Sequence, residues 1–203
     1  MSITHEVLGD ESLLASMREQ RVKGSLMAAR PRYVRETWGE EMLRRVAEAT
    51  TPEARRHLEG EPMPVSWYPL VEMVEIDQRI VEIAMRGDMR QMQPFGATIA
   101  AYDLPSLYRA LYRIGTPGFV LKSIGVAYRQ YLRPGWAKTT LDGRGRATVT
   151  IGDAVYPLYL CKYGIAGWVE SAITLSGGEG VQIEHVACVH RGDATCQWQG
   201  RWR

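Results

Sequence analysis

The clearest pattern along the chain is a helical repeat of apolar residues that follows Trp67. Apolar side chains recur there at intervals of three and four, at Leu70, Met73, Val74, Ile76, Ile80 and Ile83. This spacing places them on one face of an amphipathic helix. Gly87 is a typical residue for the end of a helix. We therefore predict a helix from Trp67 to about Gly87, with this apolar face turned to a core.

Similar but weaker spacing predicts further helices along the first two-thirds of the chain. Pro31 can begin one, and Thr51 followed by Pro52 is typical of a capped helix start. The expected helical ranges are 12–20, 31–46, 52–58, 90–101, 104–114 and 117–132.

The pattern changes after Pro134. Residues 138–151 are rich in Thr, Val and Gly, which predicts a β-hairpin turning near Gly143. A helix is expected over 158–175, and strands over 181–189 and 194–202 form a final hairpin. We predict an α+β fold in which the helical N-terminal two-thirds pack on an antiparallel sheet built from two hairpins flanking a helix. Residues 1–22 are expected to be an N-terminal extension, and 23–203 a single domain.

Composition limits the classes of protein that fit. The formal net charge is +2 and the arginines are scattered among acidic residues, which argues against a nucleic-acid surface. No apolar run is long enough to span a bilayer, and the N-terminus does not resemble a signal peptide. The three cysteines do not indicate a secreted disulfide framework. We expect a cytoplasmic protein.

The cysteines form the one pattern that indicates inorganic chemistry. Cys188 and Cys196 flank Arg191-Gly192-Asp193, and a three-residue hairpin loop there would place the two thiols opposite each other. Cys161 can reach the same point if the preceding helix packs on the sheet. Three thiols with one further ligand would suit tetrahedral zinc. Three buried cysteines without a metal are the alternative, because free cysteine often behaves as a small apolar residue.

The fourth ligand is open at this stage. Glu184, His185, His190 or water are the candidates, and Glu184 lies too far along the strand from Cys188. Because alternate residues of a strand face opposite sides, a regular strand favours His190. His185 requires a bulge before Cys188.

The C-terminal third resembles the 4-vinyl reductase domain family. The resemblance rests on Cys161, the glycine pair at 177–178, and the run from Cys188 through Gly192-Asp193 to Cys196 and Trp198. That family includes sensory domains of phenol-responsive transcription activators, and its wider superfamily includes TRAPP tethering subunits and haem nitric-oxide-binding domains. Over most of its length the chain is also similar to an uncharacterised paralogous family of myxobacteria.

The resemblance implies a structural zinc site. In the sensory members the ligands are an upstream cysteine, a glutamate three residues before the second cysteine, and a third cysteine eight residues later. The implied ligands here are Cys161, His185, Cys188 and Cys196, with histidine in place of that glutamate. The resemblance also implies a TRAPP-like and 4-vinyl-reductase-like fold that forms a homodimer.

Aromatic residues are abundant in the helical part and can line a pocket for an apolar ligand, as the resemblance implies. The candidate pocket residues are Trp67, Phe95, Tyr102, Tyr108, Tyr112, Phe119 and Tyr128. No nucleophile–base motif is present, and neither His5 nor His57 lies in the apolar frame that an axial haem ligand would need. We expect a non-enzymatic regulatory or sensory module that binds a small apolar ligand, a protein partner or both. The alternative is a scaffold or tethering subunit without a ligand.

Overall fold

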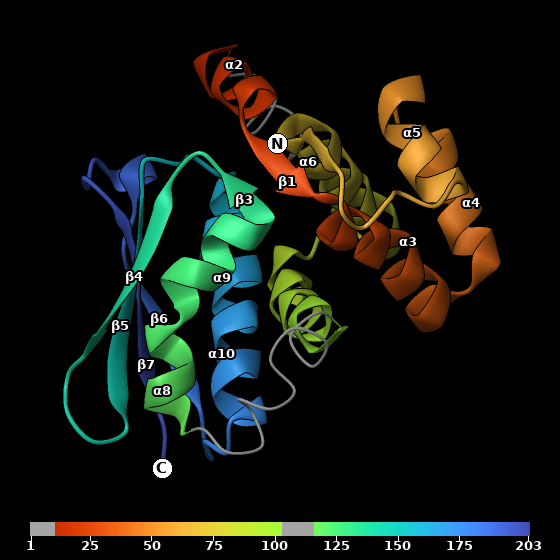
Figure 1. Ribbon diagram of the computed structural model, residues 1–203. Coiled ribbons are helices and arrows are strands. Elements are labelled where there is room, and N and C mark those ends of the chain that lie inside the picture. The colour runs from red at the N-terminus through yellow and green to blue at the C-terminus, as the bar shows by residue number, and fades with distance from the viewer. Residues whose placement is uncertain (1–10, 103–115) are drawn as a thin grey trace. The chain divides into compact units, whose positions relative to one another are not determined.

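The computed structural model describes residues 11–102 and 116–203, which fall into two compact units (Figure 1). Unit 1 is formed by the chain up to Gln91 together with Tyr131–Arg133, and unit 2 by Met92–Gln130 and Pro134–Arg203. The helix expected at 104–114 lies outside the described residues. The single domain expected over 23–203 stays a prediction, and each unit is described here by itself.

Unit 1 is mainly helical and contains the predicted amphipathic helix, which begins at Leu70; the predicted start at Trp67 is wrong, because Trp67–Pro69 form a strand. Its described elements are α2 (Glu11–Glu19), β1 (Arg21–Lys23), α3 (Gly24–Trp38), α4 (Glu40–Glu48), α5 (Pro52–Glu59), β2 (Trp67–Pro69), α6 (Leu70–Arg79), the π-helical turn η1 (Ile80–Ala84) and the 3-10 turn η2 (Met89–Gln91). The apolar face of α6 is buried, as the spacing predicts. The Thr51 side chain accepts a hydrogen bond from the Ala54 backbone N–H, which confirms the predicted cap of α5.

A small sheet in unit 1 is absent from the sequence prediction. The strands lie in the order β2-β1-β3, where β3 is Leu132–Arg133, and both pairings are antiparallel. Each strand has only two or three residues, which is too short to show an alternating pattern. Residues 11–22, expected as part of an extension, form α2 and most of β1.

Helix α3 begins earlier than predicted. It starts at Gly24 and contains Pro31 in its interior, so the predicted start at Pro31 is wrong. The helix is fixed to α6 by a buried ion pair, in which Arg30 Nε and Nη2 each lie 3.0 Å from a carboxylate oxygen of Asp77. The third guanidinium nitrogen of Arg30 donates to the Leu26 backbone oxygen. This tertiary contact stabilises a helix that contains a proline.

Unit 2 combines helices with an antiparallel sheet. Residues 92–102 are helical. The other elements are α8 (Pro117–Lys122), α9 (Ile124–Tyr131), β4 (Trp136–Leu141), β5 (Arg146–Gly152), the π-helical segment η3 (Leu160–Ile165), α10 (Ala166–Leu175), β6 (Gln182–Ala187), the 3-10 turn η4 (Val189–Arg191) and β7 (Cys196–Arg201). The strand order is β4-β5-β7-β6, and the hairpin predicted near Gly143 is confirmed as β4–β5.

The sheet of unit 2 has one covered face and one open face. Helices α8 and α10 pack on the face that carries Val149, Trp198 and Gly200 (Figure 1). Residues that alternate with these, such as Gln199, are exposed. The arrangement of a helical N-terminal region followed by an antiparallel sheet confirms the α+β class.

Glycines allow close packing within unit 2. A methyl group on Gly167 would overlap the Gln93 backbone oxygen, and one on Gly96 would overlap the Gly164 backbone oxygen. The helix at 92–102 therefore approaches η3 and α10 backbone to backbone. Within the described ranges, none of the helices is long and apolar enough to cross a membrane.

Candidate metal centre

The three cysteines meet where η3 lies against the ends of β6 and β7. Cys161 belongs to η3, Cys188 follows the end of β6, and Cys196 begins β7. The sulfur atoms of Cys161 and Cys196 are 4.0 Å apart. The ligand atoms of His185, Cys188 and Cys196 all lie within 4.8 Å of one another. We refer to Cys161, His185, Cys188 and Cys196 as the Cys–His cluster.

A β-bulge brings His185 to the thiols. His185 pairs with Trp198 and Ala187 pairs with Gln197, so the register shifts between His185 and Ala187. The prediction of His190 from the alternation of residues along the strand is wrong, because it assumes a regular strand without a bulge. The His190 Nε2 atom instead lies 2.6 Å from the Tyr156 backbone oxygen.

The predicted hairpin geometry at this site is wrong in detail. Cys196 is paired with Ile151 of β5, and Cys188 lies beyond the last residue of β6, so the two cysteines are not register partners. Residues 188–195 form a longer connection that includes η4. The thiols nevertheless come together, because the 3-10 turn folds the connection back towards the sheet.

Two residues outside the cluster hold its members in place. The Trp198 ring stacks on His185, and its Nε1–H donates to the Cys161 backbone oxygen at 2.8 Å. The Asp193 carboxylate accepts a hydrogen bond from the Cys188 N–H at 2.7 Å. These roles of Trp198 and Asp193 were not predicted from the sequence. That of Trp198 could have been, because it lies two residues after Cys196 and therefore faces the same side of the strand.

The three thiols of the cluster differ in the direction of their pKa shifts. Hydrogen bonding with Cys161 lowers the pKa of both Cys188 and Cys196. The same hydrogen bonds, together with burial, raise the pKa of Cys161. The cluster therefore stabilises thiolate at Cys188 and Cys196, and thiolate is the form of cysteine that binds metals.

Three of the four members of the cluster, His185, Cys188 and Cys196, lie close enough together to hold a metal ion, whereas Cys161 stays a predicted fourth ligand. Zn–S bonds of about 2.3 Å in a tetrahedron place the sulfur atoms about 3.8 Å apart, close to the separation of Cys161 and Cys196. The Nε2 atom of His185 is buried and has no hydrogen-bond partner among the residues that the structure describes. A buried nitrogen of this kind is costly unless a partner binds it. The His/Cys/Cys group can bind a metal ion.

The predicted aromatic pocket residues are not all in one unit. Trp67 lies in unit 1, where its ring contacts both the Lys23 ammonium and the Arg133 guanidinium. Phe95 is buried in unit 2, whereas Phe119 is 51% exposed. Tyr128, also in unit 2, is buried and its hydroxyl lies 2.6 Å from that of Tyr156.

The remaining pocket candidates are Tyr102, Tyr108 and Tyr112. Tyr102 is half-buried, and Tyr108 and Tyr112 lie outside the described residues. An apolar pocket built from the seven aromatic residues stays a prediction.

Comparison with known proteins identifies the fold. No family model matches the chain, and no curated protein matches it. Solved structures of H-NOX (haem-nitric oxide/oxygen binding) proteins do match. One from Shewanella oneidensis, in the Fe(II)NO ligation state, is 16% identical, with a TM-score of 0.69 over 89% of this chain and 99% of that chain. An Fe(II) unliganded H-NOX protein from K. algicida is 12% identical, with a TM-score of 0.65 over 89% of this chain and 96% of that chain.

These structures correct the family resemblance. The assignment to the 4-vinyl reductase and TRAPP-like family is wrong, because the matching structures are H-NOX proteins over nearly the whole chain. The motif on which that assignment was based is confined to the C-terminal third. At 10–16% identity the likeness shows an H-NOX-like fold.

Proposed function

We propose that this chain is a non-catalytic sensory module whose C-terminal sheet is stabilised by a zinc ion bound to Cys161, His185, Cys188 and Cys196. One observation carries the sensory role. The chain aligns with 99% of the S. oneidensis H-NOX structure, and this likeness over the length of a ligand-binding protein supports a sensory role.

Haem does not enter this proposal, because the described histidines and cysteines do not supply a haem ligand. A haem iron needs an axial ligand from the protein. His57 Nε2 lies 2.5 Å from a Glu72 carboxylate oxygen, and its ring packs edge-on against Tyr68. His185 and the cysteines form the Cys–His cluster, and His190 contacts a backbone oxygen.

The observed position of His57 corrects one expectation and supports this conclusion. His57 was not expected to lie in an apolar frame, yet it is only 3% exposed. It is held by a carboxylate and an aromatic ring, which fixes its orientation and occupies Nε2. An iron would have to displace Glu72 to bind it.

Zinc would act here as a structural ion. When bound, it supplies positive charge that stabilises thiolates in a buried site. The chain's own residues prepare the site: the bulge in β6 orients His185, Trp198 holds the ring, and Asp193 fixes the Cys188 backbone. These contacts link η3, β6 and β7 within unit 2.

The sensed ligand in this proposal is small and apolar. Aromatic side chains in the helical segments support it, because such sites are lined mainly by apolar and aromatic groups. A protein-binding scaffold is the second candidate. It is favoured by Phe119 on α8 and Val126 on α9, both large apolar side chains that are more than half exposed.

Metal and ligand analysis of the purified protein tests the proposal. We expect about one equivalent of zinc per chain, measured by elemental analysis without exposure to chelators, together with an absorption spectrum free of a haem band. Native mass spectrometry should detect a retained small apolar molecule. Less than about a tenth of an equivalent of zinc would contradict the metal site. An absorption band that corresponds to one haem per chain would contradict the proposal that the bound ligand is a small apolar molecule and not haem.

A further inference from the structure

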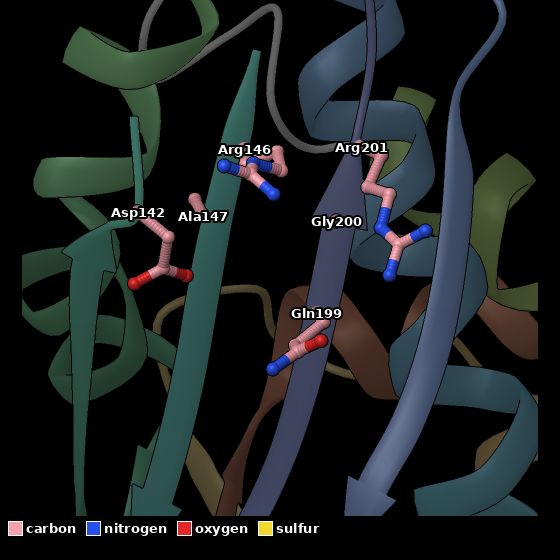
Figure 2. A pocket seen from close by; sticks show the side chains of 6 residues that line it. All are labelled: Asp142, Arg146, Ala147, Gln199, Gly200 and Arg201. Atoms are coloured by element: carbon pink, nitrogen blue, oxygen red, sulfur yellow. The ribbon is translucent and has the colours of Figure 1, made fainter. Parts of the chain in front are cut away.

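The open face of the unit 2 sheet carries a hollow at the end where the β4–β5 turn meets the C-terminal strand. Figure 2 shows Arg146 on β5 and Arg201 on the neighbouring strand β7, with Gln199 further along β7 and Asp142 beyond the end of β4. Ala147 and Gly200 complete the lining and are paired opposite each other.

Two like charges flank this hollow. Arg146 and Arg201 are register partners on adjacent strands, and both are exposed. Like charges placed directly opposite destabilise a sheet. Among the ion pairs of the described residues, none involves either arginine. The pair therefore costs stability, and no acidic side chain among the described residues forms an ion pair with it.

More positive charge surrounds the pair. Arg144 in the β4–β5 turn and Arg203 at the C-terminus are also exposed and have no ion pair among the described residues. The Trp202 N–H donates to the Gly145 backbone oxygen, which joins the β4–β5 turn to the C-terminal residues, while the Arg203 guanidinium lies against Gly180. Four exposed arginines thus lie at one end of the sheet, although the net charge of the whole chain is only +2.

The size of the hollow limits what it can hold. Its volume is about 160 Å³, whereas pockets that enclose a small-molecule ligand span roughly 300–1,000 Å³. A hollow of this size can take the end of one acidic side chain, and the open face around it leaves room for the rest of a larger molecule.

The acidic residue in the lining selects among anions. Asp142 lies at the edge of the hollow, and its carboxylate accepts a hydrogen bond from the Thr148 hydroxyl at 2.6 Å. A fixed negative charge repels a doubly charged phosphate more strongly than a singly charged carboxylate. Arginine binds carboxylates through two parallel hydrogen bonds, and the Gln199 amide adds a further donor.

We propose that this end of the open sheet face is a docking site for an acidic segment of a partner protein, with a carboxylate bound between Arg146 and Arg201. This inference goes beyond the sensory role and the zinc site, and neither is needed for it. It gives the module a surface through which its state is passed to another protein.

Peptide binding by the intact protein tests the site. The probe is a fluorescein-labelled peptide of ten glutamates, followed by fluorescence anisotropy at low salt, with a ten-glutamine peptide as the neutral reference. The variant R146Q/R201Q should bind the acidic peptide about tenfold more weakly. The matched control K122Q/R129Q removes the same charge from exposed positions on α8 and α9 and should stay within about twofold of the wild type.

The outcomes are distinguishable. Equal weakening in both double variants would show that only net charge matters and would overturn the proposal. Tighter binding of single-stranded DNA than of the peptide would overturn it in favour of nucleic acid, and displacement of the peptide by inorganic phosphate at lower concentration than by glutamate would show a phosphate site instead. Single variants R146Q and R201Q repeat the measurement in case the double variant folds poorly. Thermal melting of each variant checks folding, and loss of the like-charge pair should leave the melting temperature unchanged or higher.

Discussion

The indole ring of Trp198 lies parallel to the imidazole ring of His185, with the ring centroids 5.0 Å apart and the planes 12° from parallel. The two residues are partners across β6 and β7. The same indole also donates to the Cys161 backbone oxygen. One buried side chain therefore sets the positions of two members of the Cys–His cluster, which belong to different elements.

We expect Trp198→Phe to weaken metal binding while the ligands remain present. Phenylalanine keeps a ring against His185 but loses the hydrogen bond to Cys161, and loss of such supporting contacts typically lowers metal affinity about 10–100-fold. Competition with a chromophoric chelator measures the change. Trp136→Phe is the control, because Trp136 lies on β4, two strands away from β7, and donates to Asp153. Equal affinity in both variants would contradict a positioning role for Trp198.

Replacement of the two histidines separates the candidate fourth ligands. His185→Asn should lose most of the zinc and lower the free energy of unfolding by about 2–4 kcal/mol, because the remaining thiolates are left in a buried site. His190→Asn should keep its zinc, since the His190 Nε2 atom lies 2.6 Å from the Tyr156 backbone oxygen. Elemental analysis and thermal melting provide the two readouts. Zinc loss in His190→Asn alone would reverse the assignment.

The close packing within unit 2 predicts a steric effect at Gly167. Gly167→Ala should reduce the free energy of unfolding by about 1–3 kcal/mol, because the new methyl group overlaps the Gln93 backbone oxygen. Gly118→Ala is the matched control on α8. Its methyl group would meet only the Leu141 side chain at ordinary contact distance, so stability should stay equal or rise by up to about 1 kcal/mol. Denaturant titration of both variants compares them directly.

The buried tyrosine pair predicts a loss of stability at alkaline pH. Burial raises the pKa of Tyr128 to about 12, above the value of about 10 expected in the unfolded chain. A raised pKa favours folding below about pH 10, and that contribution is lost as the pH rises towards 12. Its size is on the order of 2 kcal/mol.

Melting temperatures measured between pH 9 and pH 12 test this contribution. The wild type should lose stability steeply over that range, and Tyr128→Phe should lose it less steeply, because phenylalanine has no proton to release. Parallel curves for the two proteins would show that Tyr128 does not control the alkaline transition.

The extent to which the sequence predicted this structure depended on the length of each pattern. The α6 helix was predictable because its apolar repeat runs through several turns, and the β4–β5 hairpin because Gly143 marks its turn. The three-stranded sheet of unit 1 was not, since its strands are too short to show a period. Pro31 was misleading because the Arg30–Asp77 ion pair, a contact between distant residues, stabilises the helix around it.

At the candidate metal centre, the fourth ligand was the one position that the sequence pattern could not decide. Spacing was enough to bring the three cysteines together as candidates. The choice between His185 and His190 depended on a single bulge in β6, which inverts the facing of every residue beyond it. A resemblance to a wrong family suggested His185, whereas parity applied to an ideal strand suggested His190.

The position of β3 in unit 1 has a consequence for how this chain can be divided. Residues 131–133 belong to unit 1, although the segments before and after them belong to unit 2, so the chain passes between the units three times. A fragment that ends at Gln91 would lack β3 and leave one edge of β1 unpaired, and exposed strand edges promote aggregation. No single cut of the chain therefore yields two intact units, and we expect both to fold only when they are expressed as one chain.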